Sequence, residues 1–375
     1  MREELQELKK NGLARNLTPS CYCANEILIG GKSYINLSSN DYLGISSRLD
    51  WQKEFLDGLA REEFLMGATS SRLLTGNSWC KEELETFIGI QYGKECLVYN
   101  SGYHANLGVL PALTNKEDLV LADKLVHASI IDGLRLCGCK WMRYRHNDSN
   151  HLERLLKEYH SLYENIYVVT ESLFSMDGDF VDLERLLLLK NKYSFKLYLD
   201  EAHAIGVVGN HGLGLAEEKG ALSEVDYLVG TLSKALASEG GFIITDLETK
   251  EWLINKSRSF IFTTAGAPVS SLWSQFVFKK MLKMKEERLY LRKITEDFRS
   301  WLPNKNVVGE SQIIPLIMRN NNKCLSYSDK LRHAGLWVSP IRYPSVPLCQ
   351  PRIRFSLTAA LKPHQMQKIH EALLD

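Results

Sequence analysis

The stretch "YLDEAHAIG" at residues 198–206 decides how this chain folds. A short apolar run ends at the acidic Asp200 and continues into an Asp-Glu-Ala-His sequence. The same four letters follow a strand in nucleic-acid helicases, which also need the phosphate-binding loop G-x-x-x-x-G-K-[ST]. The Gly-Lys-Ser at 31–33 has Glu26 where that loop requires its first glycine, and it falls in a predicted hairpin. The sequence therefore predicts that this is not a nucleotide-driven motor.

Composition narrows the class of protein further. The 375 residues include 46 Lys and Arg against 45 Asp and Glu, whereas nucleic-acid-binding proteins usually show a basic excess, so nucleic acid is not an expected partner. No apolar stretch approaches the length of a membrane span, and the amphipathic N-terminus carries both charges, unlike a signal or transit peptide. Eight cysteines lack C-x-x-C or zinc-site spacing, which indicates reduced thiols, no metal site and a cytoplasmic location.

Short apolar runs alternate with helical patterns through the first two thirds of the chain. This alternation predicts an α/β fold with a mostly parallel sheet and helices on both of its faces. The run at 241–246 follows its predecessor too closely for a crossover helix, so it is expected to pair antiparallel. The runs lie at 96–100, 119–123, 166–171, 196–201 and 226–231, with helices expected at 127–137, 148–164 and 182–192.

The pattern changes after Pro268. A long charged helical pattern continues to about residue 300, and short strands and helices follow it, which predicts a small α+β domain. The expected strands lie at 311–318, 336–341 and 351–357, and the expected helices near 326–334 and from Pro363. We expect three segments: 1–46, which packs with the small domain; 47–267, a large α/β domain; and 268–375, a linking helix and the C-terminal small domain.

Lys234 follows the apolar run that ends at Thr231. Alone it would be taken for a surface lysine, but Asp200 ends the adjacent run, and ligands of open parallel sheets bind at the carboxyl ends of the strands. Pyridoxal 5'-phosphate (PLP) requires a lysine for its Schiff base and a carboxylate for its pyridine nitrogen. The pair therefore predicts PLP as the cofactor.

Other residues at predicted strand ends can complete a PLP site. The stretch "NSGYHANLG" (100–108) turns from a strand into a helix, so the backbone N–H groups of Gly102 and Tyr103 can bind phosphate. Thr231 and Ser233 add hydroxyl groups from the lysine loop.

Three more side chains have both a functional and a structural interpretation. His203 can donate a hydrogen bond to the phenolic oxygen of the cofactor ring. His127 stands at a strand-to-helix turn, where it can stack on the ring or simply begin the helix. Ser175 is equally a cofactor contact or an ordinary turn residue.

Five motifs, in their order and spacing, resemble the α-oxoamine synthases. These are PLP enzymes of fold type I, the aspartate aminotransferase-like fold, and they condense an amino acid with an acyl-CoA and release CO₂. The resemblance extends from about Arg15 to the last helix. The motifs are "HASIIDG" (127–133), "ESLFSMDGD" (171–179), "DEAHAIGVVG" (200–209), "GTLSKA" (230–235) and "EGGF" (239–242).

The resemblance implies a role for each matching residue. Lys234 binds PLP covalently and acts as the base, Asp200 pairs with the ring nitrogen, and His127 stacks on the ring and contacts substrate. Thr264 implies a homodimer, because its counterpart in the family reaches the cofactor phosphate of the other subunit. The remaining implied cofactor contacts are His203, Ser175, Thr231, Gly102 and Tyr103, and the implied substrate contacts are Arg354, which binds the amino-acid carboxylate, and the weaker Arg15 and Ser345.

The stretches 70–78, 258–264 and 340–347 resemble the biotin-pathway branch of the family, which joins L-alanine to a pimeloyl thioester, either pimeloyl-CoA or pimeloyl carrier protein. Branches that use glycine with acetyl-CoA or serine with a long acyl-CoA remain alternatives. Two residues depart from the family pattern. Glu201 replaces a frequent Asp and is expected to face away and matter little, and Ala237 replaces a Gly in a turn that must accept a Cβ atom.

Overall fold

The computed structural model describes residues 1–23, 25–60, 64–302 and 307–374. Its contacts divide the chain into two compact units. The smaller unit contains Met1–Ser47, Ser175–Asp179 and Glu286–Asp375, and the larger unit contains Arg48–Phe174 and Phe180–Lys285. The sequence placed the start of the C-terminal domain at residue 268, whereas this division keeps residues 268–285 in the larger unit.

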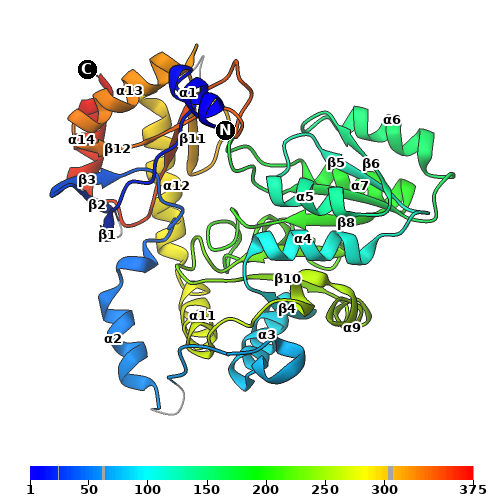
Figure 1. The fold of residues 1–375 in the computed structure, drawn as a ribbon. Coiled ribbons are helices and arrows are strands. Elements are labelled where there is room, and N and C mark those ends of the chain that lie inside the picture. Colours follow the sequence, from blue (N-terminus) through cyan, green and yellow to red (C-terminus); the bar gives the residue numbers. More distant parts are fainter. Residues whose placement is uncertain (24, 61–63, 303–306, 375) are drawn as a thin grey trace. The chain divides into compact units, whose positions relative to one another are not determined.

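A seven-stranded sheet organises the larger unit (Figure 1). The successive neighbours β9, β8, β7, β5 and β6 pair in parallel, and β10 is antiparallel to both β9 and β4. The antiparallel pairing predicted for 241–246 is therefore confirmed. In spatial order the strands are β4 (Glu95–Tyr99), β10 (Gly241–Thr245), β9 (Tyr227–Thr231), β8 (Lys196–Asp200), β7 (Ile166–Glu171), β5 (Leu119–Asp123) and β6 (Lys140–Tyr144).

The edge strand β6 was not predicted. Lys140 and Arg143 are exposed, and Trp141 and Met142 are only partly buried, so the strand lacks a continuous apolar run. An edge strand has a neighbour on one side only and does not need such a run.

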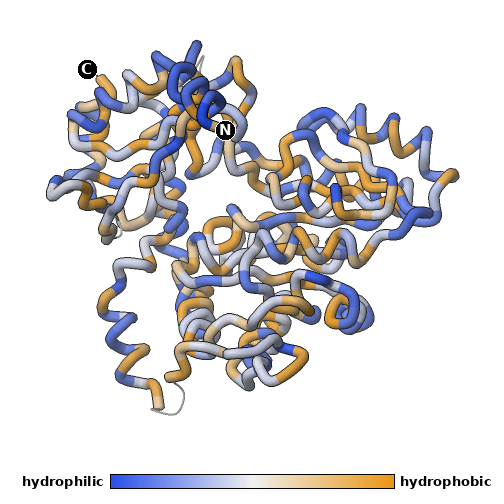
Figure 2. The backbone as a smooth tube through the Cα atoms, in the orientation of Figure 1, coloured by the Kyte–Doolittle hydropathy of each residue, from blue (hydrophilic) through white to orange (hydrophobic). Residues whose placement is uncertain are grey.

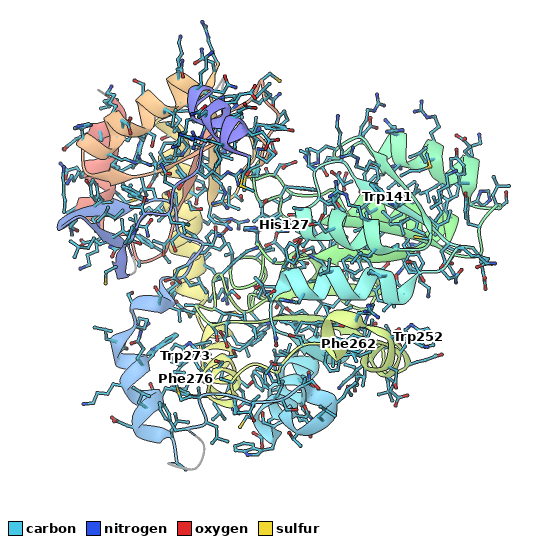
Figure 3. The ribbon with its side chains drawn as sticks, viewed as in Figure 1. His127, Trp141, Trp252, Phe262, Trp273 and Phe276 are labelled. Carbon is cyan, nitrogen blue, oxygen red and sulfur yellow. The ribbon has the colours of Figure 1, made fainter. Side chains whose placement is uncertain are left out.

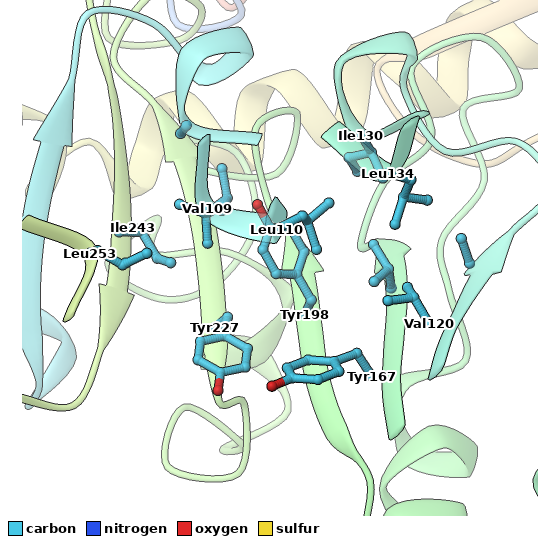
Figure 4. Close-up of a cluster of buried hydrophobic side chains, with 14 of the residues drawn as sticks. Val109, Leu110, Val120, Ile130, Leu134, Tyr167, Tyr198, Tyr227, Ile243 and Leu253 are labelled. Carbon is cyan, nitrogen blue, oxygen red and sulfur yellow. The ribbon is translucent and has the colours of Figure 1, made fainter. Parts of the chain in front are cut away.

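Both faces of this sheet are covered. Alternate residues such as Tyr167 and Val169 pack with α4 and α5 in one large hydrophobic cluster (Figure 4), and the intervening Val168 is equally buried. Figure 2 shows hydrophobic residues along these strands and polar residues along the outer helices. Burial on two faces is the expected state of a parallel sheet, which confirms the α/β interpretation.

Helices predicted from the sequence lie near their expected positions. Asp148 caps α6 by accepting a hydrogen bond from the His151 backbone N–H, and Asp182 caps α7 through Arg185 in the same way. The helices of the larger unit are α2 (Leu49–Gly58), α3 (Trp79–Tyr92), α4 (Gly102–Leu113), α5 (Ala128–Leu136), α6 (Ser149–Tyr159), α7 (Leu183–Tyr193), α8 (Leu215–Glu218), α9 (Leu247–Lys256), α10 (Arg258–Ile261) and α11 (Pro268–Met281), with a π-helical turn at Arg72–Gly76.

The single helical pattern predicted after Pro268 is wrong in one respect. The chain forms two helices, α11 and α12 (Lys285–Ser300), separated by a turn in which Lys283 and Met284 donate to carbonyls three residues earlier. The turn contains neither Gly nor Pro, so no residue in the sequence marks it.

The smaller unit combines segments from both ends of the chain. Strand β3 pairs in parallel with β12, and the predicted hairpin is formed by β2 and β3 around Gly30 and Gly31, both of which have positive φ. The predicted run 336–341 divides between two sheets. One sheet is β1 (Cys21–Cys23), β2 (Glu26–Ile29), β3 (Lys32–Asn36) and β12 (Leu336–Trp337), and the other is β11 (Ile313–Ile317), β14 (Arg352–Ser356) and β13 (Ser339–Ile341).

The helices of the smaller unit are α1 (Arg2–Lys10), a 3₁₀ turn at Ile45–Ser47, α12, α13 (Asn321–His333) and α14 (Pro363–Leu374). Within the described residues, no helix is long and apolar enough to cross a membrane.

Candidate active site

The carboxyl ends of parallel strands meet at one edge of the large sheet. Strand β5 ends at Asp123, β7 at Glu171, β8 at Asp200 and β9 at Thr231. Glu171 is the register partner of Asp200, which places their side chains on the same face of adjacent strands. Five of the residues that the sequence singled out around PLP lie at or just after these strand ends, and we call His127, Asp200, His203, Thr231 and Lys234 the strand-end cluster.

Asp200 is buried, with 6% of its surface exposed, and each of its oxygens has a donor. Asn106 donates to Oδ2 at 2.8 Å, and the backbone N–H of Ala202 donates to Oδ1 at 2.9 Å. Tyr198 donates to the amide oxygen of Asn106 at 2.6 Å, which orients the Asn106 NH₂ group toward Asp200. Two donors, one on each oxygen, thus hold the Asp200 carboxyl in a fixed orientation. Asn106 was not predicted from sequence.

His127 precedes α5 and caps it (Figure 3). Its Nδ1 accepts a hydrogen bond from the Ser129 backbone N–H at 3.2 Å and lies 2.7 Å from Ser129 Oγ, which in turn accepts from Asn106 at 3.0 Å. His127 is exposed as a residue, but desolvation of its ring lowers its pKa, and Lys234 lowers it further, while Asp200 opposes both effects. A neutral ring with an accepting Nδ1 carries its proton on Nε2. The helix-start and functional interpretations of His127 are thus compatible.

Lys234 lies in a compact loop after β9 and is partly buried. Its carbonyl accepts from the Ala237 N–H at 2.9 Å, and both Thr231 and Ser233 donate their hydroxyls to the Gly240 carbonyl. Ala237 has φ +45°, so the residue that replaces glycine sits in the left-handed region. His203 is buried in the turn that follows Asp200.

The start of α4 forms an open cradle beside Thr231. Ser101 caps the helix by accepting from the His104 N–H, which leaves the first N–H groups of Gly102 and Tyr103 for another acceptor. A Cβ on Gly102 would lie 3.7 Å from the Thr231 side chain, and a Cβ on Gly241 would lie 2.3 Å from the Gly102 nitrogen. Glycine at 241 thus permits the close approach of strand β10 to the start of α4.

Thr264 is exposed on the same unit. Its carbonyl accepts from Asn100 Nδ2 at 2.7 Å. The neighbouring Phe262 is 70% exposed (Figure 3). The role inferred for Thr264 concerns a second subunit, so it remains a prediction.

The smaller unit holds Arg354 in a set of neutral acceptors. Nε donates to the Ser175 carbonyl at 2.7 Å, Nη1 to Ser356 Oγ at 2.7 Å and Nη2 to Asn40 Oδ1 at 3.2 Å. Tyr42 lies at 3.5 Å, and its pKa is raised by burial although Arg354 lowers it. We call this group the arginine cluster, and its members are Arg354, Ser175, Ser356, Asn40 and Tyr42.

Arg352 provides an internal comparison, because it lies on the same strand as Arg354. Its Nη1 forms an ion pair with Asp177 at 2.9 Å, and the Arg352 side chain is almost fully buried. Within the described residues, Arg354 has no carboxylate within ion-pairing distance. A buried guanidinium without a carboxylate is suited to binding one from a ligand.

Arg15 and Ser345, the two weaker substrate positions, contact each other. Arg15 Nη2 donates to Ser345 Oγ at 3.1 Å at an exposed position of the smaller unit.

The family model for aminotransferase class I and II matches residues 32–373. The chain belongs to this family. Its resemblance to the α-oxoamine synthases and its type I fold are therefore confirmed.

The chain is similar to two relatives and to one solved structure along nearly its whole length. An 8-amino-7-oxononanoate synthase from Haemophilus ducreyi is 43% identical over 370 residues, 96% of this chain and 96% of that protein. One from Chlorobaculum parvum is 44% identical over 350 residues, 92% of this chain and 89% of that protein. The structure of a serine palmitoyltransferase from S. paucimobilis with a bound PLP–myriocin aldimine has a TM-score of 0.92 at 26% identity, covering 99% of this chain and 95% of that one.

The expectation that Glu201 matters little is wrong. This family member buries Glu201 completely, and its carboxylate accepts from Ser172 Oγ at 2.6 Å and from the Leu215 and Ala216 N–H groups at 2.9 and 2.8 Å. Burial raises its pKa to about 7, although these donors lower it. Glu201 thereby fixes the chain after β8 to the start of α8.

Proposed function

We propose that this protein catalyses the PLP-dependent, decarboxylating condensation of L-alanine with a pimeloyl thioester to give 8-amino-7-oxononanoate, CO₂ and the free thiol. The thiol carrier is CoA or a carrier protein. The observation that carries the proposal is the pair of relatives with this name, each above 40% identity along nearly the whole chain. The intact strand-end cluster supports an active enzyme over a regulatory subunit, since such a subunit would not need Lys234 or Asp200.

The residues present fit PLP. The open start of α4 beside Thr231 suits its phosphate, and the buried, doubly anchored Asp200 suits a protonated pyridine nitrogen. When bound, PLP acts as an electron sink for negative charge at the amino-acid Cα. We propose that Gly102, Tyr103 and Thr231 bind the phosphate, together with Thr264 from a second copy.

Each remaining residue of the strand-end cluster receives a task that its environment supports. Asp200 keeps the proton on the ring nitrogen, where it stabilises charge as that charge develops. The neutral ring of His127 stacks on the cofactor and offers its Nε2–H to substrate. His203 donates to the phenolic oxygen, and Ser175, a member of the arginine cluster, is proposed as a further cofactor contact. Lys234 holds the cofactor and, once amino acid is bound, its amine removes the Cα proton as general base.

Arg354 is proposed to bind the carboxylate of L-alanine. Its three nitrogens are already held by neutral acceptors, so the fork is oriented before substrate arrives. Arg15 and Ser345 are proposed as further substrate contacts.

A homodimer is proposed from the same family relation. The segment that leads into α3, together with the first residue of that helix, exposes large apolar side chains, which is costly in a lone subunit and typical of an interface. Leu65, Met66, Leu73, Leu74 and Trp79 are each at least 50% exposed. Light scattering coupled to gel filtration tests this, and a monomer that retains full activity would contradict the shared site.

The proposed function is tested by titrating the PLP-loaded protein with L-alanine, glycine and L-serine and following the cofactor absorbance. A response selective for L-alanine, with 8-amino-7-oxononanoate identified by mass spectrometry after adding pimeloyl-CoA, supports it. A response selective for L-serine with a long acyl-CoA would instead support the second candidate, which the serine palmitoyltransferase structure favours. A response selective for glycine with acetyl-CoA would identify the third branch.

A further inference from the structure

Glu171 is a buried acid that the proposed reaction does not use. It ends β7 with 3% of its surface exposed, directly beside Asp200 on β8. Two carboxyl groups at neighbouring strand ends repel each other when both are charged, so one of them holds a proton unless donors compensate both.

The donors are divided unequally between the two acids. Both oxygens of Asp200 accept hydrogen bonds, from Asn106 and from the Ala202 N–H. Glu171 accepts one from the backbone N–H of His127, and its Oε1 is buried with no hydrogen-bond partner. An ionised oxygen that is both buried and unpartnered is far more costly than a neutral one.

We propose that Glu171 is a neutral carboxylic acid that positions His127, with Oε1 carrying the proton. The neutral carboxyl still accepts the His127 N–H, so it fixes the start of α5 and the ring that α5 presents. It does so without adding a second negative charge next to Asp200. The inference rests on the proposed PLP site for its functional meaning but on this chain's own contacts for its evidence.

The surrounding charges agree with this assignment. Burial raises the pKa of Glu171 well above its usual value, and Asp200 and Asp123 raise it further. Lys234 and the His127 N–H act in the opposite direction but are outweighed. A raised pKa favours the protonated form of Glu171, in agreement with its buried and unpartnered Oε1.

Infrared spectroscopy tests the protonation state directly, with or without PLP. The carbonyl stretch of a protonated carboxylic acid should persist at about pH 9. This pH lies about two units above the pKa of about 7 of Glu201, so Glu201 is ionised there and does not contribute to the band. The band should vanish in Glu171→Gln, or in Glu171→Ala if the first variant does not fold. Absence of any such band in the wild-type protein would overturn the proposal whatever the substrate is.

A matched pair of isosteric substitutions tests whether Glu171 acts as a neutral group in the working enzyme. Glu171→Gln keeps a neutral acceptor for the His127 N–H, so kcat/KM should fall at most about fivefold and its pH profile should stay in place. Asp200→Asn should lower kcat by about 10²–10³-fold even with cofactor bound, because it removes the charge at the ring nitrogen. If Glu171→Gln lowers activity as much as Asp200→Asn does, or shifts the pH profile of kcat/KM, Glu171 is ionised in the working enzyme.

Discussion

The strand-end cluster and the arginine cluster are built in different ways. In the larger unit, parallel pairing alone brings Asp200 and Thr231 to one edge, because consecutive strands must end there. In the smaller unit, Arg354 lies inside a strand and is oriented by Asn40 and Ser175, which are distant in sequence. The first cluster follows from topology, whereas the second depends on individual hydrogen bonds.

The largest expected effect belongs to the strand-end cluster. Lys234→Ala should lower turnover by more than about 10⁴-fold, because the substitution removes both the covalent anchor and the base. Absorbance spectra should also lose the band of lysine-bound cofactor. Retention of near-normal turnover would remove the basis for the whole site, and the circular dichroism spectrum shows whether the fold persists.

Arg354→Lys should produce a different kind of defect. A lysine offers one point charge in place of a planar fork, so KM for L-alanine should rise about 10- to 100-fold while the absorbance of bound cofactor stays normal. Steady-state kinetics and the spectrum measure the two effects separately.

Arg352→Lys is the matched control on the same strand. Arg352 is paired with Asp177, so its replacement should lower thermal stability and leave KM for L-alanine near its normal value. If Arg352→Lys changes KM more than Arg354→Lys does, the assignment of the two arginines is reversed.

The contrast between the clusters explains what could be read from the sequence. Strand ends, helix caps such as Asp148 and the motif residues were predictable, because each depends on local chemistry or on strand order. Asn106 and Glu171 were missed, since their roles arise from contacts between helix α4, strand β7 and their neighbours. The break between α11 and α12 was missed because no breaking residue marks it.

For Glu201, the alternation of side chains along the chain predicted its orientation but not its structural role. Glu201 directly follows strand β8, and adjacent side chains of an extended chain point to opposite faces, so its separation from Asp200 was predictable, but its importance to the turn was not. The Glu201 carboxylate accepts hydrogen bonds from the backbone N–H groups of Leu215 and Ala216, which lie more than ten residues later in the chain.

Glu201 should also make stability depend on pH. Its pKa is raised to about 7 in the folded protein, so its stabilising contribution is complete below about pH 4.5 and is lost as pH rises through 7. The shift corresponds to about 3 kcal/mol. The difference in unfolding free energy between wild type and Glu201→Gln should therefore shrink between pH 5 and pH 8, as measured by chemical denaturation. A constant difference would show that Glu201 is ionised throughout.

The smallest expected effect lies in the lysine loop. Ala237 has φ +45°, and its carbonyl accepts from Trp273 Nε1 at 3.2 Å, so the strained turn is held in place. Ala237→Gly removes about 1–2 kcal/mol of Cβ strain and costs about 0.5–1 kcal/mol of unfolded-chain entropy, for a net gain of up to about 1.5 kcal/mol.

Gly240 in the same loop gives the opposite control. It has φ +115°, and a Cβ there would lie 3.2 Å from Leu232 Cδ1, so Gly240→Ala should destabilise the protein. Denaturant titrations of both variants measure the two effects. Destabilisation by Ala237→Gly would mean that the loop depends on the alanine methyl group, and the strand-end cluster would then owe its order to side-chain packing as well as to topology.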